Sequence, residues 1–147
     1  MFAELLKRLT QSDQIRPLPD EDARLALSAL LVRIARADGD YAAEEVSRID
    51  RILMQRYGLS PHGVIALRKE AEALESEAPD TVRFTRAIKD AVPYEERLGV
   101  IEALWQVALA DGARDGAEDA LVRMVSSMLG VSDQDSAVAR QRMQGGA

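Results

Sequence analysis

Apolar residues recur at helical spacing along almost the whole chain, with polar residues between them. Alternation of single apolar and polar residues, which is typical of strands, does not persist anywhere. The sequence therefore predicts an all-α fold. The stripes expected to face inward are Phe2, Leu5, Leu6 and Leu9; Leu27, Leu30, Leu31, Ile34 and Ala35; Ile49, Ile52 and Leu53; Leu98, Ile101, Leu104, Trp105 and Ala108; and Leu121, Val122 and Val125.

Helix-breaking residues divide these stripes into about seven or eight helices with short turns, as in a compact bundle. Gly39 and Gly58 stand where helices should end. Ser60 should cap the helix that Pro61 opens, and Ser132 should cap the last helix, with Asp135 completing a capping box. The expected helices run over about 2–9, 20–38, 42–57, 60–77, 81–91, 93–108, 115–129 and 132–143.

Two stretches of the chain nearly repeat each other. In both, an Ala-Asp-Gly turn is followed by a glutamate seven residues after the aspartate, and then by Gly-Leu-Ser or Gly-Val-Ser. This repeat predicts two similar helical hairpins, over 24–60 and 97–132, related by an approximate two-fold axis. The matching residues are Ala37-Asp38-Gly39, Glu45 and Gly58-Leu59-Ser60 in the first copy, and Ala110-Asp111-Gly112, Glu118 and Gly130-Val131-Ser132 in the second.

With 147 residues, the chain is expected to form one helical domain over 20–143, preceded by an amphipathic helix and linker over 1–19 and followed by a flexible tail over 144–147. A net charge of -6 argues against nucleic acid as a partner. No cysteine and a single histidine exclude thiol chemistry and His-rich metal sites within one chain. No apolar run approaches a membrane span or a signal peptide, so we expect a cytoplasmic protein.

Four carboxylates occupy unusual positions, because they continue the apolar stripes rather than the solvated helix faces. These are Asp38 and Glu45 in the first copy, and Asp111 and Glu118 in the second. The neighbouring Glu44, in contrast, lies on a face that continues with arginines, so we expect it to point into solvent. The four acids are therefore the best candidates for a site.

Two interpretations of these acids remain open. Asp-Gly is a common helix stop, and Asp115 with Glu118 fits a capping arrangement, so the acids can be purely structural. Alternatively, an aspartate near the partly negative end of a helix calls for compensation, which a bound cation would supply. Oxygen ligands favour Mg²⁺, Ca²⁺ or Mn²⁺. The seven-residue spacing does not fit an EF-hand, whose glutamate comes later in the loop.

The two Ala-Asp-Gly segments, over 31–39 and 102–112, together with 57–60 and 129–132, resemble the signature helices of TerB-like proteins, a family associated with bacterial tellurite resistance. The resemblance covers 22–142. It implies an all-helical fold, divalent-cation binding through the acids, and a stress-response or membrane-complex adaptor role. The family's further acid would be Asp40 in the first copy and Asp115 in the second, so its position shifts.

The leading hypothesis is a non-enzymatic, TerB-like cytoplasmic module for stress response, linked to tellurite resistance, that binds a divalent cation or a protein partner. Its first alternative is a purely structural helical adaptor with no metal site. A metal-dependent hydrolase is disfavoured, because no substrate-binding motif accompanies the acids. No cofactor other than the cation is expected, and the expected partners are proteins, including those of a membrane-associated complex, but neither nucleic acid nor a membrane span.

Overall fold

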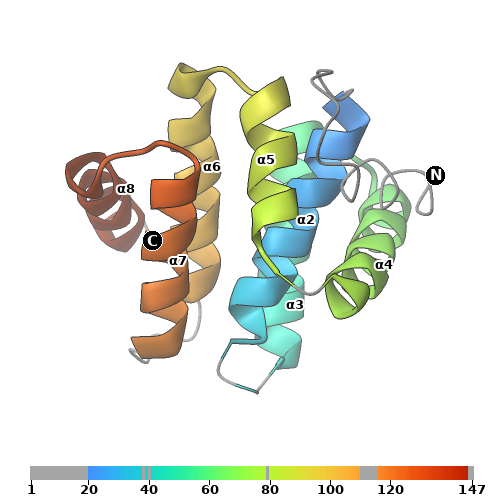
Figure 1. Cartoon of the computed structure of the whole chain (residues 1–147). Helices are drawn as coiled ribbons and strands as arrows, with labels where there is room; N and C mark the ends of the chain where they lie inside the picture. Colours follow the sequence, from blue (N-terminus) through green and yellow to red (C-terminus); the bar gives the residue numbers. More distant parts are fainter. Residues whose placement is uncertain (1–19, 38, 40, 79, 110–115, 146–147) are drawn as a thin grey trace.

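The computed structural model describes residues 20–37, 39, 41–78, 80–109 and 116–145. This part of the chain forms α-helices and contains no strand (Figure 1), which confirms the all-α prediction. The expected helix over 2–9 lies outside the described residues. The helices are α2 (Asp20–Ala35), α3 (Ala43–Tyr57), α4 (Pro61–Glu77), α5 (Val82–Ala91), α6 (Tyr94–Ala108), α7 (Gly116–Met128) and α8 (Asp133–Gly145).

The junction between α3 and α4 uses the predicted breaker and cap. Gly58 ends α3 with a left-handed φ of 64° and donates its backbone N–H to the carbonyl of Met54 over 2.8 Å. The Ser60 hydroxyl then accepts the N–H of Gly63 over 3.0 Å, and Pro61 is the first helical residue of α4. These residues turn the chain within three positions and keep α3 and α4 adjacent.

The equivalent junction between α7 and α8 is built in the same way. Gly130 has a φ of 77°, and the Ser132 hydroxyl accepts the N–H of Asp135 over 3.1 Å. Among the described residues, no bond from the Ser132 N–H to the Asp135 carboxylate completes the predicted capping box, and that carboxylate accepts the phenol O–H of Tyr94 at 3.1 Å. Asp135 therefore links the start of α8 to the start of α6.

Two helix ends differ from the sequence prediction. α2 ends at Ala35 rather than near position 38; Arg36 and Ala37 lie in a turn, and Gly39 has a φ of 84°. The last helix continues through Gly145, so Gln144 and Gly145, which the sequence placed in the tail, are helical. Asp20 is the first residue of α2.

The order of packing repeats along the chain and includes α4 and α8, which follow the two predicted hairpins. The first repeat therefore comprises α2, α3 and α4, and the second comprises α6, α7 and α8. α2 packs against α3 and α4, and α6 packs in the same way against α7 and α8, while α2 and α6 contact each other. α2 and α6 run in the same direction (Figure 1). The carboxyl ends of α2 and α6 and the amino ends of α3 and α7 therefore lie at one end of the molecule, the lower edge of the view.

The core lies around α2, which is buried along nearly its whole length. Its residues from Leu25 to Val32 are all buried, Ser28 included, and the Ser28 hydroxyl donates to the carbonyl of Arg24 over 2.8 Å. Trp105 of α6 is 1% exposed, which confirms the prediction that it belongs to the core. Among the described residues, no helix combines the length and apolarity needed to cross a membrane.

α5 has no counterpart in the repeat and is held at both ends by arginines. At its start, Arg33 of α2 donates to the carbonyl of Ala78 at 2.7 Å and to the hydroxyl of Thr81 at 3.4 Å. At its end, Arg97 of α6 donates to the carbonyls of Lys89 at 3.1 Å and Val92 at 2.9 Å. Arg97 also reaches the Leu129 carbonyl after α7, at 3.2 Å. One arginine from each half of the molecule thus fixes α5.

Candidate functional site

Glu45 is the third residue of α3, and its side chain points inward. It is 3% exposed, whereas the adjacent Glu44 is exposed. Its Oε1 accepts the backbone N–H of Ala42 over 3.2 Å, which is the reciprocal half of a capping box. The predicted contrast between Glu44 and Glu45 is confirmed.

Glu118 occupies the equivalent third position of α7 and is 1% exposed. Because the amino ends of α3 and α7 lie at the same end of the molecule (Figure 1), both buried glutamates belong to that end. A carboxylate in the first turn of a helix is stabilised by the free N–H groups there and by the helix dipole. This setting offsets part of the cost of burying an ionised group.

The other candidate ligands, Asp38, Asp40, Asp111 and Asp115, lie outside the described residues. Within the part of the chain that the structure describes, no cluster of three or more His, Asp or Glu side chains could hold a metal ion. The convergence of the six acids on a cation therefore stays a prediction. For Glu45, the structure gives one definite role, the cap on α3.

A network of ionic and polar groups joins α3 and α4 to the turn that precedes α3, and no sequence motif predicted it. Arg68 donates to Asp50 at 2.6 Å and to Glu72 at 3.0 Å. The phenol of Tyr41 donates to the same Glu72 carboxylate at 2.7 Å. Burial and the hydrogen bond to Glu72 raise the pKa of Tyr41 well above its usual value. The charge of Arg68 is thus paired with carboxylates of both α3 and α4.

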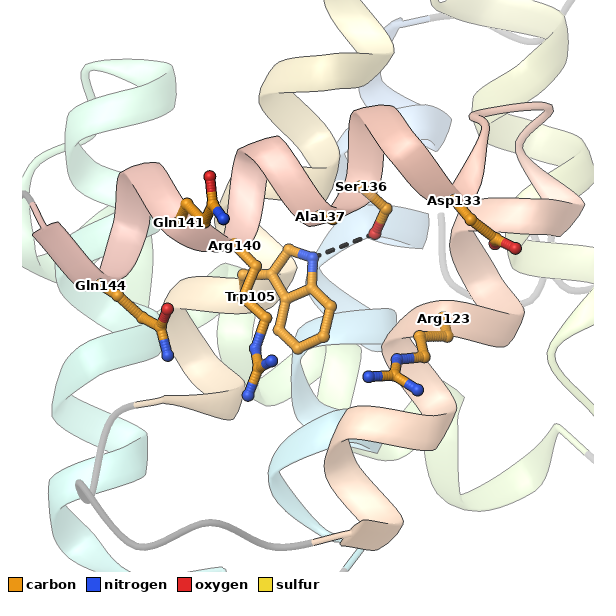
Figure 2. Close-up of a pocket in the computed structure, with 8 residues that line it drawn as sticks. All are labelled: Trp105, Arg123, Asp133, Ser136, Ala137, Arg140, Gln141 and Gln144. Atoms are coloured by element: carbon orange, nitrogen blue, oxygen red, sulfur yellow. Dashed lines mark hydrogen bonds between the residues drawn. The ribbon is translucent and has the colours of Figure 1, made fainter.

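The second repeat has a cavity of about 530 Å³ between α6, α7 and α8 (Figure 2). α8 supplies most of its wall, because one face of that helix is turned towards Arg123 of α7 and Trp105 of α6. No motif in the sequence predicted this site. Its lining residues are Trp105, Arg123, Asp133, Ser136, Ala137, Arg140, Gln141 and Gln144.

A buried chain of hydrogen bonds runs from this cavity into the core. The indole N–H of Trp105 donates to the Ser136 hydroxyl at 3.1 Å. The hydroxyls of Ser136 and Ser126 are 3.1 Å apart, and Ser126 donates to the Val122 carbonyl at 2.8 Å. Because each hydroxyl has one proton, all three contacts form only if Ser136 donates to Ser126. The protons therefore point in one direction, from Trp105 to the backbone of α7.

Comparison with known proteins identifies the family. The family model described as tellurite resistance protein TerB matches residues 24–141, close to the 22–142 for which the sequence motifs showed a resemblance. Neither a curated protein nor a solved structure matches the chain significantly. The family match spans α2 to α8, including both repeats and α5 between them. The chain therefore belongs to the TerB family of tellurite resistance proteins.

Proposed function

We propose that this chain is a non-enzymatic stress-response module linked to tellurite resistance, and that its paired acidic turns bind a divalent cation. The observation that carries the proposal is the burial of Glu45 and Glu118, two equivalent residues from the two repeats, at the same end of the molecule. The proposed ligands are these two glutamates with Asp38 and Asp111, and Asp40 and Asp115 as the further acids.

The chemistry supports a hard cation. Carboxylate oxygens are the ligands that Mg²⁺, Ca²⁺ and Mn²⁺ prefer. Carboxylates gathered at one end of a bundle repel one another and raise one another's pKa values, and a divalent cation relieves that repulsion. Burial strengthens both effects, because water screens charges less there.

A second function, a helical adaptor for protein partners without a metal, is favoured by a different observation. The hydrogen bond from the Ala42 N–H to Glu45 gives the inward glutamate a structural role that needs no ion. If the acids of the second copy act in the same way, both turns serve the fold, and function lies on the outer surface. The two functions make opposite predictions about the effect of cations on stability.

Thermal unfolding distinguishes the cation-binding function from the metal-free adaptor function. The melting temperature is measured with Mg²⁺, Ca²⁺ and Mn²⁺ at constant ionic strength for the native chain and for Glu45→Gln combined with Glu118→Gln. A cation at a hundredfold excess over its Kd stabilises the fold by about 2.7 kcal/mol. For a chain of this size, that corresponds to a rise of roughly 5 to 10 °C. The double variant should lose this rise, and Glu44→Gln, an exposed neighbour, should keep it.

Equal melting temperatures with and without each of the three ions, and no heat in calorimetric titrations, would eliminate the cation site and leave the adaptor function. A rise that survives in the double variant would place the ion elsewhere. The link to tellurite is tested by comparing the growth on tellurite of cells that carry the native chain or the double variant.

A further inference from the structure

We propose that the cavity between α6, α7 and α8 is a binding site for a small molecule that carries an oxyanion, with Arg123 and Arg140 as the residues that recognise it. This inference does not depend on the cation site, since it uses different residues in the second repeat. Figure 2 shows the guanidinium groups of Arg123 and Arg140 on either side of the Trp105 indole. Two guanidinium groups held around one cavity are suited to the oxygens of a carboxylate or a phosphate.

Arg140 is held in place before any ligand arrives. It pairs with Asp119 over 3.1 Å, and its guanidinium carbon lies 5.1 Å from the centre of the Trp105 ring. The Nε of Arg140 is buried and has no hydrogen-bond partner in the described structure. A buried donor without an acceptor is costly, and a ligand oxygen would satisfy it.

Arg123 supplies an uncompensated charge. It is exposed, and no described residue forms a hydrogen bond or an ion pair with it. Asp133 is the one carboxylate among the lining residues, and Figure 2 shows it pointing away from the indole. The lining therefore has a positive centre in a chain whose net charge is -6. Such a local field attracts anions that the rest of the surface repels.

The first repeat provides an internal comparison. When the two copies are aligned on their Ala-Asp-Gly turns, Arg123 corresponds to Asp50. Aligned on Gly58 and Gly130, the copies match Arg140 with Arg68 and Gln144 with Glu72. In the first repeat, the arginine is neutralised by both acids, at 2.6 and 3.0 Å. In the second repeat, an arginine and a glutamine replace those acids. Arg140 pairs instead with Asp119 of α7, and the charge that remains is that of Arg123.

The buried polar chain beneath the cavity differs between the copies as well. The corresponding residues of the first repeat are buried and apolar, which shows that the scaffold does not need polar groups at these positions. At these positions the second repeat therefore has hydrogen-bonded polar side chains where the first has apolar ones, and these polar groups lie behind the two arginines. The matched positions are Val32 and Trp105, Leu53 and Ser126, and Val64 and Ser136.

The size of the cavity indicates more than a bare ion. About 530 Å³ lies within the range of small-molecule sites. Gln141 and Gln144 on the same face of α8 offer amide donors and acceptors to the rest of the ligand. The shared chemistry is the oxyanion, and its source is a carboxylate or a phosphate of a small organic molecule. Tellurite is tested beside them as a bare oxyanion, given the family to which the chain belongs, and saturation by tellurite alone would overturn the small-molecule assignment.

Trp105 is the one tryptophan of the sequence, so its fluorescence and its indole N–H resonance report on the cavity alone. The full chain is titrated with sodium benzoate, phenyl phosphate and sodium tellurite at constant ionic strength, with sodium chloride as the control salt. The chain has no cysteine that could reduce tellurite. We expect a saturable shift of the Trp105 signals with benzoate or phenyl phosphate, and the organic probe that saturates identifies the source of the oxyanion.

Arg123→Gln should weaken that binding by at least roughly tenfold, since one charge-assisted pair is lost. Arg123→Asp, which gives the second repeat the charge of the first, should abolish it. Arg51→Gln, an exposed arginine of α3, is the matched control and should bind like the native chain. Unchanged melting curves verify that the variants fold. No saturable response to any of the three oxyanions, or equal affinity in Arg123→Gln and the native chain, would overturn the proposal.

Discussion

Replacing Ser136 with alanine tests the buried hydrogen-bond chain behind the cavity. The substitution removes the acceptor of the Trp105 indole N–H. Trp105 is 1% exposed and Ser136 is 3% exposed, so the lost hydroxyl is one that solvent barely reaches. The variant therefore leaves a buried donor unsatisfied, whereas Ser126 keeps its bond to the Val122 carbonyl.

The expected loss in the free energy of unfolding follows from the Trp105 indole N–H, which stays buried without an acceptor. A buried polar group left without a partner costs about 1 to 3 kcal/mol, more than the net contribution of an average hydrogen bond. A loss of about 2 kcal/mol in stability should lower the melting temperature of a chain of this size by roughly 4 to 8 °C. Removing Ser126 should cost less, because Trp105 then keeps its acceptor. The two substitutions should not be additive, since they act on one chain of bonds.

Urea unfolding followed by circular dichroism measures these free energies, and an unchanged m-value confirms that the compactness of the unfolded state is the same. Ser127→Ala is the matched control, because Ser127 is the exposed neighbour of Ser126 and should change stability by less than about 0.5 kcal/mol. A Ser136→Ala variant as stable as this control would show that the indole N–H does not depend on Ser136, and the reasoning would fail.

Three further predictions concern the turns and the first repeat. Gly58→Ala should lose about 1 kcal/mol in urea unfolding because of its φ of 64°, and an equal loss in Gly99→Ala, within α6, would contradict this reason. Ser60→Ala should lose about 1 kcal/mol and Ser60→Asp should retain most of the stability in the same assay; no loss in the alanine variant would exclude the cap. The raised pKa of Tyr41, caused by burial and by Glu72, means that its contribution to stability is complete below about pH 10 and is lost as the pH rises further. Tyr41→Phe should therefore reduce the decline of stability above about pH 10 in pH-dependent unfolding, and a decline as steep as that of the native chain would refute this assignment.

The sequence predicted which face of each helix is buried more reliably than where each helix ends. Glu45 and Glu118 are buried because they continue apolar stripes with the period of a helix, and the stripe depends only on local sequence. The end of α2 was placed too late: the Arg36 N–H still bonds to the Val32 carbonyl as in a helix, but the Ala37 N–H bonds to the nearer Ile34 carbonyl, as in a turn. Helix ends depend on a few weak contacts, so a pattern locates them poorly.

The cavity could not be predicted, because its residues come together only through the packing of three helices. In the sequence pattern, Arg123 and Arg140 have the positions of ordinary polar residues on a solvated helix face. The one signal in the sequence was the reversal of charge between Asp50 and Arg123 at matched positions of the repeat. The acidic site predicted from the turns remains a prediction, since Asp38, Asp40, Asp111 and Asp115 lie outside the described residues.

The two arginines that hold α5 have a consequence for how the molecule unfolds. In linear repeat proteins each unit contacts only its neighbours, so units can open one after another. Here, α5 cannot detach without breaking the contacts of Arg33 from the first half and those of Arg97 from the second. The free energy of opening either half is thereby coupled to the other, so the slowest-exchanging amides of α2 and α6 should report the same global opening. A duplicated architecture thus behaves as a single cooperative unit.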